Sequence, residues 1–196
     1  MKIAAAIIAG GRSSRMGQEK TLQKIGGETI LAIVIERISP QVDVLAINAN
    51  GNLSRLEAYG YPIVPDILTK TGTPLCGLHA AMTWATVQGC DLLLTVPSDC
   101  PFLPRDLVER LRASGAPAIA ASGGARHFLT GLWPVSLLPV LHAAIIDGRL
   151  FRMKDWANIV HAQSVEWRIK PVDPFFNINT PEDLAEACRL AAQSPP

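Results

Sequence analysis

The 196-residue sequence predicts an α/β fold, a Rossmann-like doubly wound and mostly parallel (mixed) sheet with helices on both faces in three layers. Two observations carry this prediction. Short apolar strands alternate with helical patterns along most of the chain, and the early strands are apolar along nearly their whole length. Strands of this kind are typical of a parallel sheet that is buried on both faces. In such a fold, ligands bind outside the carboxyl ends of the strands.

The first half of the chain supplies four expected strands, at residues 3–8, 42–47, 61–64 and 91–96. Helical spacing of apolar residues predicts helices around 30–38, 53–59 and 75–85 between them. Each strand is followed by small or polar residues, which are Gly10-Gly11, Asn48, Asp66 and Asp99 in that order. We therefore expect these residues to meet at one edge of the sheet.

The second half is less regular. A strand at 117–121, a turn at Gly123-Gly124 and a returning strand at 128–133 are expected, followed by helices at 137–145 and 151–160. The last helix has the clearest start, because Thr180 can cap it, Pro181 suits its first position and acidic residues fill its first turn.

Composition bounds the class of protein. The chain has 18 basic and 17 acidic residues, so it lacks the basic surplus of a nucleic-acid-binding protein. Its length fits one domain, residues 1–196. The four cysteines are scattered without metal-ligand spacing, which favours a reducing compartment. Neither a signal peptide nor an apolar run of about 18 to 20 residues is recognised, so we expect a cytoplasmic protein without a membrane partner.

The first strand runs into a glycine-rich basic loop that contains Gly10, Gly11, Arg12, Arg15 and Lys20. Glycine lets the backbone approach phosphate oxygens, and the N–H groups of such a loop can bind an anion. The loop fails the Walker pattern and the dinucleotide-binding pattern, because its glycines have the wrong spacing in both cases. It therefore predicts a phosphorylated ligand that is bound by another kind of loop.

Five segments together resemble the molybdenum cofactor guanylyltransferases of the nucleotidyltransferase superfamily, over nearly the full chain. They are the loop Ala-Gly-Gly-x-x-x-Arg-Met-Gly-x-x-Lys at 9–20, Asn48-Ala49-Asn50 with Asp66, residues 72–78, residues 97–103, and Phe-Asn-Ile-Asn-Thr-Pro-Glu-Asp-Leu at 176–184. The chain departs from the family pattern at Glu19, Thr73, Cys76 and Phe128, the last of which follows Arg126-His127 where the family tends to have proline.

The resemblance implies a single nucleotidyltransferase domain that transfers GMP from GTP to the terminal phosphate of molybdopterin, releasing pyrophosphate with Mg²⁺ as cofactor. Because a phosphate monoester is largely dianionic above its second pKa of about 6, the nucleophile needs little activation. The alternative enzyme is a molybdopterin cytidylyltransferase or another small-molecule phosphate nucleotidyltransferase, and the alternative from a different class is a non-catalytic cofactor carrier. Molybdoenzyme apoproteins or insertion chaperones are the further partners implied.

The resemblance also implies roles for individual residues. Arg15, Lys20 and Asp99 are the expected catalytic residues, with Asp99 also holding the metal. The expected nucleotide-binding residues are Ile8, Ala9, Gly10, Gly11, Lys20, Asn48, Asp66 and Asp99. Asn177 and Asn179 lie two apart in an extended segment, so both should face the acceptor phosphate. A turn asparagine remains an equally good interpretation of Asn48. His79, His127, His142 and His161 show no ligand spacing and are interpreted as structural or surface residues.

Overall fold

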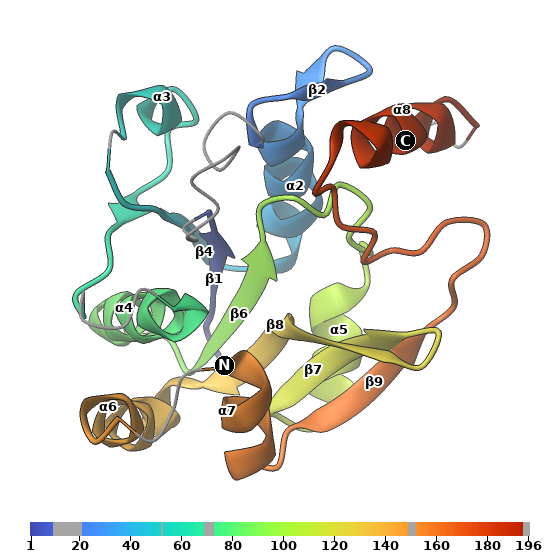
Figure 1. The fold of residues 1–196 in the computed structure, drawn as a ribbon. Helices are drawn as coiled ribbons and strands as arrows, with labels where there is room; N and C mark the ends of the chain where they lie inside the picture. Colours follow the sequence, from blue (N-terminus) through green and yellow to red (C-terminus); the bar gives the residue numbers. More distant parts are fainter. Residues whose placement is uncertain (10–20, 52, 69–72, 149–151, 194–196) are drawn as a thin grey trace.

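The computed structural model describes residues 1–9, 21–51, 53–68, 73–148 and 152–193, and its centre is a seven-stranded sheet in the order β5-β4-β1-β6-β8-β7-β9 (Figure 1). Within this sheet, the strand pairs are parallel except the two that β8 makes with β6 and β7. The strands are β1 (Ile3–Ile8), β4 (Val44–Asn48), β5 (Ile63–Val64), β6 (Leu92–Pro97), β7 (Ala118–Ser122), β8 (Ala125–Pro134) and β9 (Gln163–Trp167). The predicted fold class is confirmed.

Helices cover both faces of the sheet. One apolar cluster joins the sheet to α2 (Ile30–Ile38) and α5 (Leu107–Ala113). The other joins it to α4 (Pro74–Val87), α6 (Leu138–Ile146) and α7 (Met153–Ile159). Strand β1 is buried at every position and supplies alternate residues to the two clusters, which is the pattern of a central strand in a three-layer fold.

A smaller apolar cluster lies beside the carboxyl edge of the sheet. It joins the hairpin of β2 (Lys24–Ile25) and β3 (Glu28–Thr29) to the C-terminal helix α8 (Pro181–Gln193) through Ile25, Ile30, Ile178 and Ala187. Helix α8 begins as predicted, since Asp183 N donates to Thr180 Oγ1 at 3.1 Å and Thr180 N donates to Asp183 Oδ2 at 2.9 Å. The cluster holds the segment before α8 against the sheet.

Several elements differ from the sequence expectation. The helix expected around 53–59 is the single turn α3 (Ser54–Glu57), and the third strand is reduced to β5. The sequence analysis did not predict the β2–β3 hairpin, α5, β9, or the short 3-10 helices η1 (Ser39–Gln41) and η2 (Val135–Leu137). The predicted turn between β7 and β8 is confirmed, because Gly123 and Gly124 have φ of 54° and 81°, values that glycine adopts without strain.

Replacing Thr95 with valine is expected to destabilise the fold by about 1–3 kcal/mol, because it leaves a buried donor unpaired. Trp133 Nε1 donates to Thr95 Oγ1 at 2.8 Å, and Thr95 Oγ1 donates to Leu129 O at 2.8 Å, with Thr95 and Trp133 both fully buried. Urea unfolding measures the loss. Thr86→Val is the matched control on the exposed surface of α4, and equal stability of the two variants would contradict the prediction.

Candidate functional site

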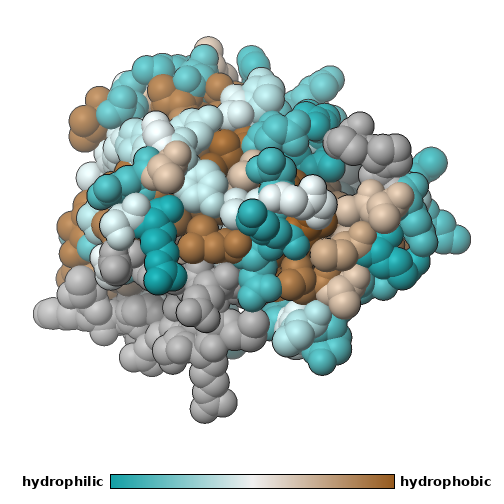
Figure 2. Space-filling model, turned by 90° about the horizontal axis from the view of Figure 1, so that it is seen from above, coloured by the Kyte–Doolittle hydropathy of each residue, from teal (hydrophilic) through white to brown (hydrophobic). Residues whose placement is uncertain are grey.

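The predicted site lies at the carboxyl ends of β4, β1 and β6. The chain passes from β1 to β4 on one side and later returns to β6 on the other, so a crevice is expected between the ends of β1 and β6. Ala9 N donates to Asn48 O at 2.8 Å, and Ser98 N donates to Ile8 O at 3.2 Å, which ties the three strand ends together. Seen from above, the described surface at this end of the molecule mixes hydrophilic and hydrophobic side chains (Figure 2).

Asn48, at the end of β4, holds the carboxylate of Asp66. The Asn48 side chain is buried, with 1% exposed, and its Nδ2 donates to Val64 O and to Asp66 Oδ1, both at 2.9 Å. These bonds use both protons of the amide. A contact between Asn48 and a nucleotide stays a prediction, whereas the contacts present make Asn48 a support for Asp66.

Asn50 completes the support of Asp66 from the other side. Asn50 Nδ2 donates to Asp66 Oδ2 at 2.9 Å, while Asp66 N donates to Asn50 Oδ1 at 2.8 Å. Each carboxylate oxygen of Asp66 therefore accepts one amide proton and keeps further acceptor capacity. Because Asp66 is half-buried, this carboxylate can still accept hydrogen bonds from a ligand. The sequence analysis noted Asn50 as part of a motif but gave it no role.

Gly77, in the first turns of α4, allows the helix to approach Asn48. A Cβ at this position would lie 2.4 Å from Asn48 Oδ1 and 3.2 Å from Asn48 Cγ. No side chain fits there unless Asn48 moves. The helix therefore packs directly on the amide that supports Asp66. This close packing explains why the 72–78 motif has a glycine at position 77.

Asp99 and the segment before α8 lie side by side. Ile178 N donates to Asp99 O at 3.1 Å, and Cys100 Sγ donates to Phe175 O at 3.7 Å. The structure thus joins residues at the end of β6 to residues almost eighty positions later in the chain. It brings together two of the sequence motifs, 97–103 and 176–184.

The two asparagines of the last motif are both exposed, and Ile178 between them is buried. This pattern of exposure is compatible with the predicted projection of both asparagines to the same side. Asn179 N donates to Asp183 Oδ2 at 2.7 Å, so the backbone at Asn179 belongs to the start of α8. Their contact with an acceptor phosphate stays a prediction.

Four of the predicted site residues, Gly10, Gly11, Arg15 and Lys20, lie outside the described residues. Ile8 is buried and Ala9 half-buried at the end of β1, where Ile8 O and Ala9 N already pair with neighbouring strand ends. Their backbone contacts with a nucleotide stay predictions.

Two of the histidines contact each other at the packing of α4 on α6. His79 Nε2 and His142 Nδ1 lie 3.0 Å apart, and His79 is buried while His142 is exposed. Burial lowers the pKa of His79, and the neighbouring His142 lowers it further. The pair joins two helices on one face of the sheet, which agrees with the structural role expected for His79.

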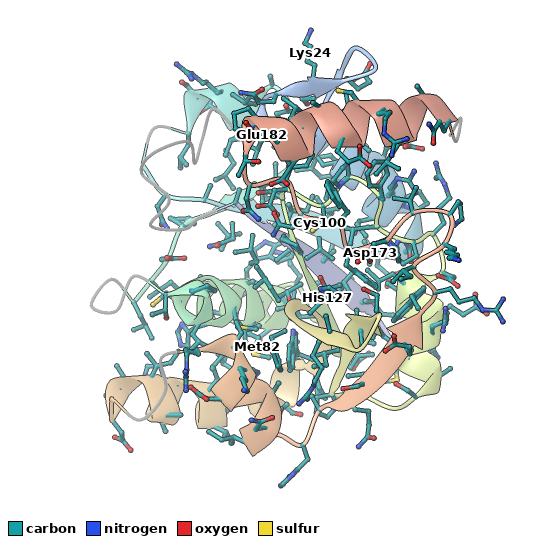
Figure 3. All side chains as sticks on the ribbon, turned by 45° about the vertical axis from the view of Figure 1, so that its right-hand side comes forward. Lys24, Met82, Cys100, His127, Asp173 and Glu182 are labelled. Carbon is teal, nitrogen blue, oxygen red and sulfur yellow. The ribbon has the colours of Figure 1, made fainter. Side chains whose placement is uncertain are left out.

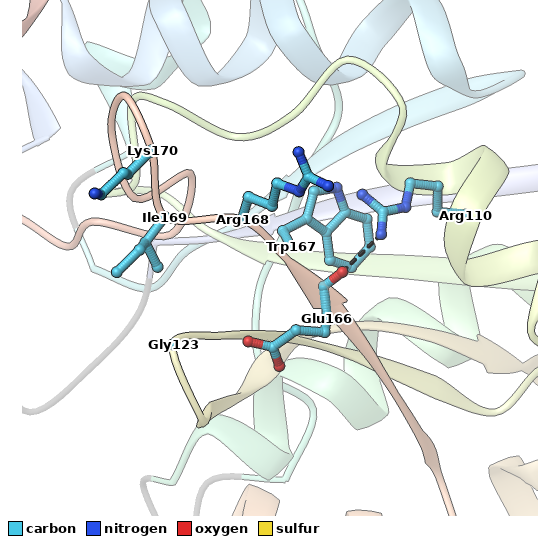
Figure 4. Close-up of a pocket in the computed structure, with 7 residues that line it drawn as sticks. All are labelled: Arg110, Gly123, Glu166, Trp167, Arg168, Ile169 and Lys170. Carbon is cyan, nitrogen blue, oxygen red and sulfur yellow. Dashed lines mark hydrogen bonds between the residues drawn. The ribbon is translucent and has the colours of Figure 1, made fainter.

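An open groove of about 770 Å³ lies at the far end of the same edge, beyond β8 (Figure 4). Its lining residues are Arg110, Gly123, Glu166, Trp167, Arg168, Ile169 and Lys170. Arg110 is engaged in packing, since its Nη2 donates to Glu166 O at 2.6 Å and its guanidinium carbon lies 4.2 Å from the centroid of the Trp167 ring. None of the predicted site residues that the structure describes lines this groove, so its volume does not mark the described part of the predicted site.

Comparison with known proteins identifies relatives over the whole chain. The model of the MobA-like NTP transferase domain family matches residues 5–163. The molybdenum cofactor guanylyltransferase of Bradyrhizobium sp. (strain ORS 278) is 43% identical over 194 residues, covering 95% of this chain and 92% of the relative. The molybdenum cofactor guanylyltransferase of Rhodobacter capsulatus is 40% identical over 199 residues, covering 100% of both chains.

Solved structures share the fold. Molybdopterin-guanine dinucleotide biosynthesis protein A from Archaeoglobus fulgidus superposes with a TM-score of 0.70 at 22% identity, covering 99% of this chain and 100% of that chain. At this identity the likeness concerns the fold alone. It supports the three-layer arrangement described above.

Proposed function

Because the chain belongs to the MobA-like NTP transferase family, and within it to the molybdenum cofactor guanylyltransferases, we propose that it transfers GMP from GTP to molybdopterin. The product is the guanine dinucleotide form of the cofactor, and pyrophosphate leaves. One observation of the structure supports this proposal most directly. Two groups are held by separate hydrogen bonds: Asp66 by Asn48 and Asn50 after β4, and Asp99 by the segment before α8 after β6. They lie on opposite sides of the carboxyl end of β1.

The nucleotide half of the site is assigned to the ends of β1 and β4. Asp66 accepts from Asn48 and Asn50, which fixes the direction in which its remaining acceptor positions point. Guanine and ribose both carry donors that an ionised carboxylate can accept. Asp66 therefore suits a nucleoside contact, while Arg15 and Lys20 of the glycine-rich loop remain the proposed contacts to the triphosphate.

The acceptor half is assigned to Asn177 and Asn179, in the segment whose Ile178 N donates to the backbone of the proposed metal ligand Asp99. The terminal phosphate of molybdopterin attacks the α-phosphorus of GTP, the new phosphorus–oxygen bond forms to that phosphate, and the bond to the leaving pyrophosphate breaks. Chemistry of this kind depends on positioning and on neutralising negative charge. Asn177 is exposed and directly precedes Ile178, whose N donates to Asp99 O, so its amide is proposed to donate to an acceptor phosphate oxygen.

Mg²⁺ is the proposed metal, and Asp99 is its proposed protein ligand. Within the described residues no group of three or more histidine, cysteine or acidic side chains is arranged to hold a metal alone. Mg²⁺ in nucleotide-transfer sites is commonly bound by one or two carboxylates together with substrate phosphates, so the half-buried carboxylate of Asp99 fits this metal. Bound Mg²⁺ would neutralise charge on the triphosphate.

Cytoplasmic location and docking to molybdoenzyme apoproteins or insertion chaperones remain proposals from the resemblance. Cys76, Cys90, Cys100 and Cys188 are not joined in disulfide bonds, which is compatible with a reducing compartment. No helix among the described residues has the length and apolar character that a bilayer span requires.

Base choice gives the direct test of the proposal. With molybdopterin as acceptor and Mg²⁺ present, pyrophosphate release is expected with GTP at a kcat/KM at least about tenfold above that with CTP or ATP. The assay measures pyrophosphate and the dinucleotide product in parallel for the three nucleotides. A preference for CTP would identify a cytidylyltransferase instead. Binding of molybdopterin without any transfer would favour a non-catalytic carrier.

A further inference from the structure

A chain of partly buried hydrogen bonds links the β7–β8 hairpin to the segment that precedes α8. Ser122 closes β7 and is buried, with 2% exposed. Its Oγ lies 2.8 Å from His127 Nε2 on β8 and donates to Asp173 Oδ1 at 2.9 Å. Figure 3 shows His127 and Asp173 together near the middle of the molecule, with Cys100 beside them. None of these contacts is explained by the roles assigned above.

The direction of each bond follows from counting protons. An ionised carboxylate only accepts, so the single proton of the Ser122 hydroxyl goes to Asp173. His127 Nε2 must then carry a proton and donate it to Ser122 Oγ. Burial lowers the pKa of His127, against the opposing effects of Asp173 and Glu166. The neutral imidazole that carries its proton on Nε2 therefore satisfies the chain of bonds.

The chain of bonds ends at the turn that leads into the acceptor half of the site. Asp173 Oδ1 also accepts from Phe175 N at 3.0 Å. The Phe175 ring packs between His127, with centroids 4.6 Å apart, and Trp167, with centroids 5.4 Å apart and planes at 82°. Phe175 is 3% exposed, so both its backbone and its ring are fixed.

The chain is therefore held in place on both sides of Asn177. On one side Phe175 is held by Asp173, His127 and Cys100, and on the other side Ile178 N donates to Asp99 O. Ile178 is also buried against α8 and the β2–β3 hairpin. With Phe175 and Ile178 both held, the backbone at Asn177 has little freedom to move away from Asp99.

We propose that Ser122 and His127 are positioning residues for the acceptor half of the site. They do not touch the reacting groups. They hold Asp173, and through it the 173–178 segment, so that Asn177 stands beside Asp99 when molybdopterin is bound. This inference rests on the proposed function, because it assigns the segment to the acceptor phosphate.

Ser122→Ala gives the main test, because it removes only the oxygen at the centre of the chain of bonds. The kcat/KM for molybdopterin is expected to fall about 10- to 100-fold, while the affinity for GTP and Mg²⁺ in calorimetry stays within about twofold of wild type. Ser164→Ala, an exposed serine on the neighbouring strand β9, is the matched control and should behave as wild type. Loss of GTP affinity together with acceptor turnover would show a general structural defect and overturn the positioning role.

Two variants of His127 distinguish the effect of its Nε2–H hydrogen-bond donor from the effect of its ring packing. His127→Phe keeps an aromatic ring against Phe175 but cannot donate, whereas His127→Gln keeps a donor at the reach of Nε2 and loses the ring. The proposal requires acceptor kcat/KM to fall in His127→Phe and to return to within about threefold of wild type in His127→Gln. Equal impairment of the two variants would assign the effect to ring packing and overturn the donor role of His127.

Amide hydrogen exchange in the free protein supplies a readout that needs no substrate. Ser122→Ala and His127→Phe should speed exchange at the Phe175 and Ile178 amides by at least about tenfold, with the β1 and β6 amides unchanged. Wild-type exchange and wild-type turnover in Ser122→Ala would overturn the inference. If the wild-type protein transfers no GMP, the proposed function is wrong. The exchange rates would still show whether Ser122 and His127 stabilise the 173–178 segment.

Discussion

Replacing Asp99 with alanine is expected to lower turnover by about a thousandfold or more while the fold stays intact, because the substitution removes the carboxylate proposed to hold Mg²⁺. The backbone carbonyl of Asp99, which accepts from Ile178 N, is retained in the variant, so the segment before α8 keeps its place. Pyrophosphate release from GTP and molybdopterin measures the turnover. Calorimetric titration of GTP with Mg²⁺ present measures whether the metal-dependent part of the affinity is lost.

Asp91 provides a matched control at the opposite end of the same strand. It is exposed and its Oδ2 accepts from Lys2 N at 2.7 Å, far from the carboxyl edge. Asp91→Ala should leave turnover within about twofold of wild type, since it changes surface charge away from the site. Turnover of Asp99→Ala within tenfold of wild type, with Mg²⁺ dependence unchanged, would contradict the metal assignment and the mechanism with it.

The sequence predicted the centre of the fold because its strands bury both faces. The six residues of β1 and of β6 are all buried, so their apolar runs identify them without help from tertiary context. Elements that lack a buried apolar run or a full helical period were not predicted. Strand β9 is an edge strand in which only Trp167 is buried, so it has no apolar run. Helix α5 has seven residues, too few for a helical period to stand out.

The positions of the described site residues at the sheet edge could be predicted from the sequence, but the hydrogen bonds among their side chains could not. Asp66 and Asp99 each follow a strand, and strand ends of a parallel sheet share an edge. The Asn48 atoms that can still bind a ligand cannot be identified locally. They depend on a hydrogen bond to Asp66, eighteen positions away, and on the pairing of β4 with β5. Ser122 and Asp173 are fifty-one positions apart, so no local sequence pattern predicts the hydrogen bond between them. The sequence analysis therefore interpreted His127 only as a structural or surface residue.

Gly77→Ala is expected to destabilise the protein by about 1–3 kcal/mol and to weaken GTP binding, because a methyl group would overlap Asn48. Helix propensity alone predicts the opposite sign, since alanine is favoured over glycine within a helix by about 1 kcal/mol. The new Cβ would lie 2.4 Å from Asn48 Oδ1, and Asn48 is buried and bonded to Val64 O and Asp66. Chemical unfolding measures the stability, and calorimetry with GTP and Mg²⁺ measures the affinity.

The double variant Gly77→Ala/Asn48→Ala separates the clash from other effects of the methyl group. If the overlap with Asn48 is the cause, removing that side chain should make Gly77→Ala less destabilising in the Asn48→Ala background than in wild type, an interaction of about 0.5–3 kcal/mol. GTP affinity should stay low, because Asp66 has then lost one of the two amides that hold its carboxylate. Thr86→Ala on the exposed side of α4 controls for helix propensity and should stabilise by up to about 0.7 kcal/mol. A Gly77→Ala protein that is as stable as Thr86→Ala and binds GTP normally would show that Asn48 can move freely. The support of Asp66 by Asn48 would then have no part in nucleotide binding.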